Sequence, residues 1–159
     1  MWQCGTIQLD LAMPARFGLE YVEAGGSRRA PFLLHRAVFG SLERFLGVLL
    51  EHHGGQLPAW LAPEQILVAP LSAEQLGYAR EVAAELRAAG LRSRVDARNE
   101  SVGRKVRDAH GAGVPLVVVL GGREVERRSV SIRGRDGVSS ERALEEGLGA
   151  LKEACRPPS

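Results

Sequence analysis

The sequence predicts an α/β protein in two parts: antiparallel strands with one helix first, and a mixed sheet covered by helices second. Three observations predict this. Residues up to about 60 contain three strand-like apolar patterns followed by one helical pattern. Beyond them, strand and helix patterns alternate. Glycine- and proline-rich stretches at 54–58 and 62–63 separate the two regions. We therefore predict domains at residues 1–60 and 61–159.

In the first part, three segments carry strand signals, and a glycine-rich turn at 24–27 joins the last two of them: 3–10, 17–22 and about 30–39. The apolar run of the third segment is typical of a buried strand. It leads through Gly40 into a helix that Ser41 is suited to cap, with leucines at helical spacing. Gly54 and Gly55 mark the end of that helix.

The second part contains four strand signals, at 65–69, 91–96, 114–120 and 129–133. Helical patterns cover 72–90 and 101–112, and we expect Ser139 to cap a last helix. Ser72 and Gln75 form a capping-box sequence. The unbroken run 114–120 is the best candidate for a central strand, and we expect Gly121 and Gly122 to turn the chain after it. This order predicts the mixed sheet.

The composition is that of a globular protein, with 45% hydrophobic and 25% charged residues. We expect no membrane segment, since no apolar run approaches the roughly 20 residues that span a bilayer. The N-terminus has no cationic leader, and Cys4 and Cys155 form no CxxC pair, so we expect a cytoplasmic protein with reduced thiols. The net charge of +2 permits an acidic partner without requiring one.

One arginine and one cluster of basic residues each have more than one interpretation. Arg44 lies off the apolar stripe of its helix and beside Gly47, which leaves room for a flat ligand to stack on it. Spacing alone favours a solvated arginine on an amphipathic helix. The cluster, in the second part of the chain, contains Arg98, Arg104, Lys105 and Arg107. A solvated face is its common explanation, and binding to a phosphate backbone is the sharper one.

The segment 35–45, HRAVFGSLERF, resembles the third signature motif of threonyl-tRNA synthetases, a class II family. Segments 2–10, 14–21, 60–63 and 96–103 resemble other parts of the same enzymes. The resemblance covers nearly the whole chain. It implies the end of the catalytic domain, followed by the anticodon-binding domain that synthetases for histidine, glycine, threonine and proline share. Class II motifs 1 and 2 do not occur in this sequence, so we expect the chain alone not to form threonyl-adenylate.

In the first domain, the resemblance implies that Arg44 contacts ATP as a catalytic residue, where a fixed positive charge stabilises the reacting phosphates. Gln3 and Gln8 match residues of the threonyl-adenylate pocket. His35 matches one of three protein ligands of zinc, whose other two lie upstream in the family. A single imidazole does not hold zinc. ATP and zinc are thus cofactors of the full-length family, and we expect this chain alone to bind neither.

In the second domain, Asn99, Glu124 and Arg133 match family residues that read anticodon bases, and such side chains suit hydrogen bonding to splayed bases. Arg104, Lys105 and Arg107 are expected to contact phosphates. Gly113 stands where the family usually has a basic residue, so we expect one tRNA contact to be missing. The implied partner is threonine tRNA, with no DNA and no membrane. The family's homodimer is built largely by motif 1, so the sequence does not predict the oligomeric state of this chain.

Two hypotheses follow. The chain is the C-terminal region of a threonyl-tRNA synthetase, which attaches threonine to its tRNA with ATP when full length. Alternatively, it is a free-standing truncated paralogue that binds tRNA or a protein and catalyses nothing. Gly113 and the absent motifs favour the second, and the near-intact third motif favours the first.

Overall fold

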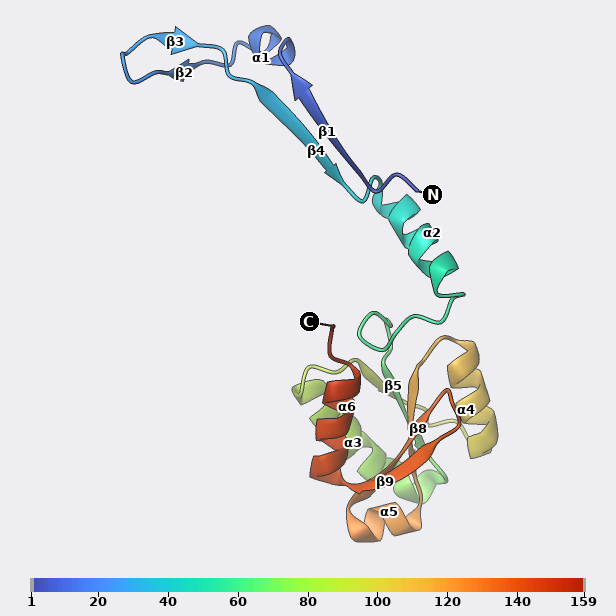
Figure 1. Cartoon of the computed structure of the whole chain (residues 1–159). Coiled ribbons are helices and arrows are strands. Elements are labelled where there is room, and N and C mark those ends of the chain that lie inside the picture. Colours follow the sequence, from blue (N-terminus) through green and yellow to red (C-terminus); the bar gives the residue numbers. More distant parts are fainter. Residues whose placement is uncertain (1, 159) are drawn as a thin grey trace. The chain divides into compact units, whose positions relative to one another are not determined.

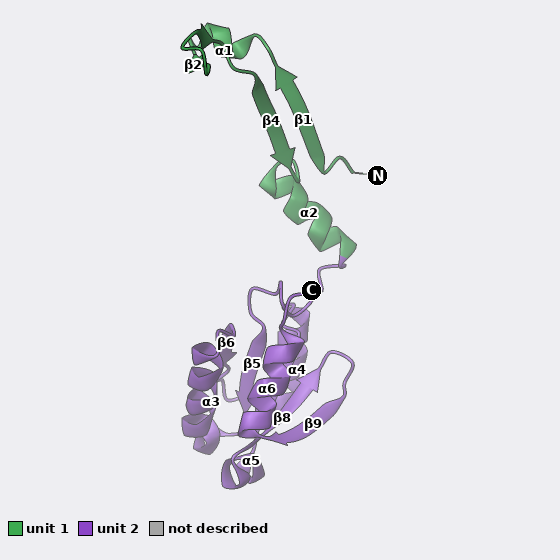
Figure 2. Ribbon diagram, turned by 60° about the vertical axis from the view of Figure 1, so that its left-hand side comes forward, with its two compact units in different colours: residues 1–52 green, residues 53–159 purple. Residues whose placement is uncertain are grey.

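A computed structural model describes residues 2–158, and its internal contacts divide the chain after His52 into two compact units (Figure 2). We call the part up to His52 unit 1 and the part from His53 onward unit 2. Segment 53–60, which we expected at the end of the first domain, belongs to unit 2. One reason is a hydrogen bond: the carbonyl of Leu57 accepts from the guanidinium of Arg135 at 3.1 Å.

Unit 1 consists of two antiparallel strand pairs and two helices: β1 (Gly5–Asp10), α1 (Met13–Arg16), β2 (Tyr21–Val22), β3 (Arg28–Arg29), β4 (Leu33–Val38) and α2 (Leu42–His52). Strand β1 pairs with β4, and β2 pairs with β3 (Figure 1). The expected strand at 17–22 is reduced to β2, and α1 was not predicted. The α1 turn forms because the Asp10 carboxylate accepts the backbone N–H groups of Ala12 and Met13 at 2.9 Å.

Unit 1 has almost no hydrophobic core. Among its described residues, Pro14 is the only one that is buried. The prediction that β4 is a buried strand is wrong for this chain, because Leu34 is 68% exposed and its neighbour across the pair, Leu9, is 61% exposed. The apolar stripe of α2 is also open to solvent. Both strands therefore present apolar side chains that the described residues of unit 1 do not cover.

Unit 2 is built on a five-stranded mixed sheet in the order β6-β5-β7-β8-β9, in which β6, β5 and β7 are parallel and β8 and β9 are antiparallel. This confirms the predicted α/β class. The elements are β5 (Ile66–Pro70), a 3₁₀ turn η1 (Ala73–Gln75), α3 (Leu76–Ala88), β6 (Ser93–Val95), α4 (Val102–Gly111), β7 (Leu116–Leu120), α5 (Gly122–Arg127), β8 (Ser129–Gly134), β9 (Ser139–Ala143) and α6 (Leu144–Ala154).

Two predictions for unit 2 were wrong. Ser139 begins the edge strand β9, and the last helix starts only at Leu144. The chain after β7 forms the short helix α5 where we expected a turn. Strand β9 escaped prediction because its sequence, Ser-Ser-Glu-Arg-Ala, is polar on both faces and carries no apolar alternation.

Helices cover the two faces of the sheet unequally (Figure 1). Helices α3 and α6 pack on one face, around Val82, Leu86, Val118 and Leu151. Helix α4 packs on the other face over β5 and β7, around a cluster of buried apolar side chains: Leu67, Ala69, Val106, Ala109, Val114 and Val117. Across residues 2–158 no helix has the length and apolar character needed to cross a bilayer.

Candidate functional site

The carboxyl edge of the parallel strands carries two of the three expected base-reading residues. Asn99 follows β6 and is exposed. Glu124 lies in the first turn of α5, directly after β7, and its Oε2 accepts the Gly121 N–H at 2.8 Å. Because parallel strands end at the same edge of a sheet, β6 and β7 bring both side chains to this edge.

Arg133 lies elsewhere on unit 2, within the antiparallel strand β8. It pairs with Val117 of β7 and Ser139 of β9, and its Nε donates to Ser139 Oγ at 3.0 Å. Its side chain shares the sheet face of Val117, which α4 covers over β5 and β7. Helix α6 packs on β8 and β9 from the opposite face. Arg133 is therefore half-buried on a polar stretch of sheet beside α4.

The three basic residues of α4 have different environments. Arg104 and Arg107 are exposed, and Arg104 pairs with Glu100 at 3.4 Å. Lys105 is only 2% exposed, and its Nζ donates to the carbonyls of Pro70 at 2.9 Å and Asp96 at 3.1 Å. We expected Lys105 to contact phosphates, but in this structure its ammonium faces the interior of unit 2. Its position, one before buried Val106 and four before Ala109, turns it toward the sheet.

Arg98 is exposed, but its guanidinium is paired with two carboxylates of unit 2. Its guanidinium contacts the Asp96 carboxylate at 2.7 Å and the Asp108 carboxylate at 3.0 Å. The Arg98 guanidinium holds the pKa of the buried Asp96 carboxyl below its ordinary value. The basic cluster thus contains two exposed cations, Arg104 and Arg107, one exposed cation paired with carboxylates, Arg98, and one buried cation, Lys105.

A cavity of about 280 Å³ opens where β5 and β6 end. Its lining comes from both strand ends, from the start of α3 and from α4: Pro70, Leu71, Ser72, Ala73, Leu76, Ala97, Arg98, Asn99 and Lys105. Leucine side chains offer apolar surface for a planar group, and the Asn99 amide offers both a donor and an acceptor. Such a combination suits an unstacked nucleobase, which is held by stacking and by hydrogen bonds to its edge.

Gly113 has a structural reason to be glycine. Its φ of +85° is in the left-handed region that other residues rarely adopt. Its carbonyl accepts from the Arg135 guanidinium, which also holds Leu57. Burial lowers the pKa of Arg135, and its Nε has no hydrogen-bond partner among the described residues. A basic side chain at position 113 would require a strained backbone here.

In unit 1, the expected pocket residues meet on one face of the β1–β4 pair. Gln8 lies directly opposite His35, and both line a hollow of about 700 Å³ together with Asp10. Gln3 Nε2 donates to Thr6 Oγ1 at 2.8 Å. Thr6 is two residues before Gln8 and so points to the same face. We did not single out Thr6 from the sequence, although strand alternation from Gln8 places it there.

The turn before α2 is tightly constrained. Phe39 and Gly40 have φ values of +65° and +69°, and the Phe39 N–H donates to the Cys4 carbonyl. The Phe39 and Phe45 rings lie 4.5 Å apart. Ser41 Oγ accepts the backbone N–H of Arg44 at 3.2 Å, which confirms Ser41 as the N-cap. A left-handed Phe39 is costly for a residue with a bulky side chain, and such conformations cluster at functional sites. The turn fixes the start of the helix that carries the exposed Arg44.

The residues of unit 1 do not fit zinc by themselves. His35 is exposed, and across residues 2–158 no three His, Cys, Asp or Glu side chains gather as a metal site. Cys4 directly precedes β1 and is four residues from Gln8, the pairing partner of His35, which corresponds to about 13 Å of extended chain. His35 could thus supply only one of the protein ligands that a zinc site needs.

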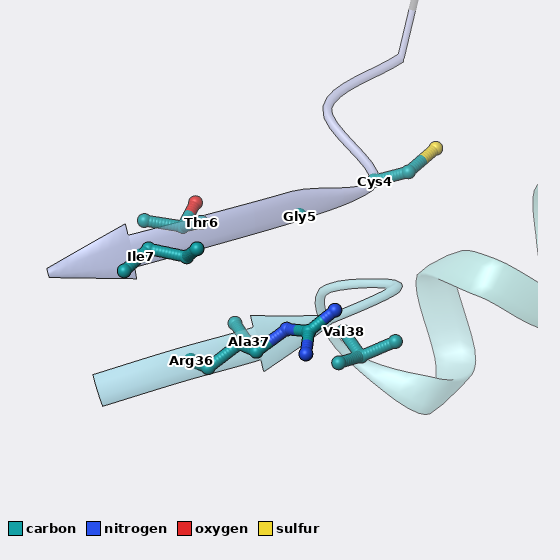
Figure 3. Close-up of a pocket in the computed structure, with 7 residues that line it drawn as sticks. All are labelled: Cys4, Gly5, Thr6, Ile7, Arg36, Ala37 and Val38. Atoms are coloured by element: carbon teal, nitrogen blue, oxygen red, sulfur yellow. The ribbon is translucent and has the colours of Figure 1, made fainter. Parts of the chain in front are cut away.

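A second hollow of unit 1, of about 320 Å³, is lined by Cys4, Gly5, Thr6, Ile7, Arg36, Ala37 and Val38 (Figure 3). It contains none of the expected pocket residues Gln3, Gln8, His35 or Arg44. Ile7 and Arg36 are paired across the strands, and Ile7 is 70% exposed. We interpret this hollow as part of the uncovered surface of the strand pair.

Comparison with known proteins assigns each unit to a family domain. The family described as "Anticodon binding domain" matches residues 65–154. The family described as "tRNA synthetase class II core domain (G, H, P, S and T)" matches residues 1–53. The chain is 46% identical to a threonine–tRNA ligase from Rhodopseudomonas palustris over 99% of its own length and 24% of the relative's. It is 48% identical to the Paracoccus denitrificans ligase, with the same coverage.

Solved structures of tRNA synthetases have a similar fold to this chain. The RNA-binding domain of threonyl-tRNA synthetase from Cryptosporidium parvum superposes with a TM-score of 0.87 at 34% identity, covering 99% of this chain and 40% of that one. Prolyl-tRNA synthetase from the same organism, solved with L-proline and AMP, gives a TM-score of 0.75 at 28% identity, covering 96% and 34%. The chain spans about a quarter of the length of the curated ligases it matches.

Proposed function

We propose, from the premise that this chain belongs to the threonyl-tRNA synthetase family and corresponds to its C-terminal region, that unit 2 binds the anticodon arm of threonine tRNA. Together with the rest of the class II core, unit 1 would take part in the ATP-dependent attachment of threonine to that tRNA. The observation that carries the proposal is the arrangement of Asn99, Glu124 and Arg133 around the carboxyl edge and the open sheet face beside α4.

On unit 2, the proposed division of labour follows from chemistry and exposure. Asn99, Glu124 and Arg133 offer an amide, a carboxylate and a guanidinium, which hydrogen-bond to the edges of unstacked bases. Arg104 and Arg107 are exposed on α4 and are suited to phosphates, which position the RNA without reading its sequence. This assigns sequence discrimination to the first three residues and general affinity to the two arginines.

On unit 1, we propose that Gln3, Gln8 and Thr6 line one wall of an adenylate pocket and that Arg44 contacts ATP phosphates. Gln8 shares its face with Thr6 and His35, and Thr6 holds Gln3. Arg44 lies in the capped first turn of α2, and a positive charge beside a phosphate stabilises the charge that develops there. The strand pair would supply one side of such a pocket, and the described residues of unit 1 do not close the other side.

The test is a titration of labelled anticodon stem-loops, one with the threonine anticodon and one with a swapped anticodon. We expect tighter binding of the threonine loop. Arg133→Ala and Glu124→Ala should narrow the difference by about 1–3 kcal/mol per contact, if the magnitude for bidentate readout of DNA bases transfers to RNA.

The matched control is Arg87→Ala, which removes the same charge from α3 on the opposite face of the sheet. It should leave the difference unchanged. Equal affinity of the parent chain for both loops would contradict anticodon reading. That result would favour the second hypothesis, a binding module without anticodon specificity.

A further inference from the structure

Lys105 joins the ends of two neighbouring strands. Pro70 is the last residue of β5, and Asp96 directly follows β6. The Lys105 ammonium donates to the carbonyls of both at 2.9 and 3.1 Å. Beyond this point the two strands separate, because Leu71 N–H turns to the Leu120 carbonyl on the other side. The lysine thus satisfies two buried carbonyls with one cation at the place where the ladder opens.

The two loops that Lys105 joins form the walls of the 280 Å³ cavity. Residues 71–73 follow Pro70 on one side, and residues 97–99 follow Asp96 on the other. Asn99, the proposed base-reading residue, is three positions from the carbonyl that Lys105 holds. The bridge therefore lies at the base of both loops, including the one that carries Asn99.

We infer that Lys105 is a positioning residue of the RNA site: it sets the cavity between β5 and β6 and presents Asn99, and it makes no phosphate contact. The inference rests on the proposed function, since it assigns a role within the same site. Arg98 assists from the other side of the loop, where its contacts with Asp96 and Asp108 tie residues 96–98 to α4.

The two possible roles of Lys105 have different signatures. A cation that neutralises a phosphate releases counterions, so its loss flattens the dependence of affinity on salt. An ammonium that is 2% exposed and bound to two backbone carbonyls releases none, and its loss instead disturbs the groups it holds. Arg107, two residues further along α4 and exposed, is the matched control for charge.

The experiment compares Lys105→Met with Arg107→Met in the whole chain, using the cognate and swapped stem-loops at several salt concentrations. For Arg107→Met we expect both loops to bind more weakly by the same factor, and the slope of log K against log salt to fall by about 0.7–0.9. For Lys105→Met we expect an unchanged slope and a fall of about tenfold in the ratio of cognate to non-cognate affinity, the scale of one base contact.

A cycle with Asn99→Ala tests whether Lys105 acts through Asn99. Once Asn99 is removed, Lys105→Met should reduce the ratio little further. The proposal is overturned if Lys105→Met flattens the salt slope as Arg107→Met does, or if it folds and leaves the ratio unchanged.

Lys105→Arg covers the case in which Lys105→Met does not fold. Arginine keeps the charge and would preserve a phosphate contact, but its planar guanidinium does not reproduce the point bridge between two carbonyls. For Lys105→Arg we expect a lower ratio of cognate to non-cognate affinity and an unchanged slope of log K against log salt. If both the ratio and the slope equalled those of the parent chain, the proposal would be overturned. If the parent chain itself does not discriminate between the loops, the proposed function fails, independently of the role of Lys105.

Discussion

Strands β4 and β7 both contain runs of apolar residues, and their environments are opposite. Strand β7 lies in the middle of a five-stranded sheet, with helices on both faces, and Val117 and Val118 are fully buried. Strand β4 pairs only with β1, and its Leu34 and Val38 are exposed. The local pattern predicts a strand in both places, but burial depends on the other strands and helices that pack against it. The described residues of unit 1 supply no such neighbours for the exposed side chains of β4.

The contrast extends to whole units. Unit 2 encloses two clusters of buried side chains on the two faces of its sheet. Unit 1 spreads its apolar residues over a two-stranded pair, a short hairpin and one helix. An isolated two-stranded hairpin is marginally stable in water, and an uncovered apolar strand pair is a site for association. We therefore expect the units to differ more in stability than in secondary structure.

The largest expected effect is in amide hydrogen exchange. We predict that the amides of β5 and β7 exchange on the order of 1,000-fold more slowly than those of β1 and β4, because the former open only with the core. Mass-spectrometric exchange on the whole chain at several protein concentrations measures this. If copies of the chain cover each other's strands, protection of β1 and β4 should rise with concentration while that of β5 and β7 stays constant. Equal protection at high dilution would contradict the comparison.

A pair of leucine truncations gives the next largest effect. Leu86 of α3 is fully buried, whereas Leu46 of α2 is 48% exposed. Leu86→Ala should lower the free energy of unfolding of unit 2 by about 2–5 kcal/mol, since it removes contacts and leaves a cavity. Leu46→Ala, the same chemical change in unit 1, should alter that value by no more than about 0.5 kcal/mol.

Denaturant unfolding followed by fluorescence of Trp60 measures this pair, with Trp2→Phe as background so that the signal reports on unit 2 alone. If Leu46→Ala lowered the free energy of unfolding as much as Leu86→Ala, α2 would have to be covered by packing that is not among the contacts of unit 1 described above.

Local signals predicted much of the fold. The capping box of Ser72 and Gln75 and the N-cap Ser41 depend on residues a few positions apart, and both form as expected. The succession of strands and helices along unit 2 also followed from periodicity, except for α5 and β9. Ser139 looks like a helix cap because the polar sequence of β9 gives no sign of its pairing with β8. The short helix α5 was missed because it begins at a pair of glycines, Gly121 as the N-cap and Gly122 as its first residue.

The site was less predictable, because it depends on where side chains point. Sequence spacing grouped Lys105 with Arg104 and Arg107, but only the packing of α4 on the sheet shows that Lys105 faces inward. Arg135 was not singled out at all, since its two acceptors, the carbonyls of Leu57 and Gly113, lie 78 and 22 residues away in sequence. Backbone acceptors have no sequence signature.

The smallest expected effect is in the pH dependence, and it compares Asp96 of unit 2 with Asp10 of unit 1. Both carboxyl groups have a lowered pKa: Asp96 chiefly through its hydrogen bonds with the Arg98 side chain, and Asp10 through the N–H groups of Met13 and Ala12. A carboxyl group whose pKa is lower in the folded state stabilises the fold above its unfolded pKa of about 3.9. That contribution is lost as the pH falls through the folded pKa.

Asp96→Asn should therefore make unit 2 less stable than the parent near neutral pH, and the gap should close as the pH falls below about 4, where the parent's carboxylate takes up its proton. Asp10→Asn should leave the Trp60 transition unchanged at every pH, because Asp10 lies in unit 1 and its bonds close only the α1 turn. Unfolding curves of the three chains between neutral and acidic pH, in the Trp2→Phe background, measure both.

A constant gap in stability between Asp96→Asn and the parent would show that the cost of the substitution comes from lost packing or hydrogen bonds and not from the charge that Arg98 stabilises. A shift of the Trp60 transition by Asp10→Asn would show that the stabilities of the two units are coupled, and would remove the basis for treating them separately.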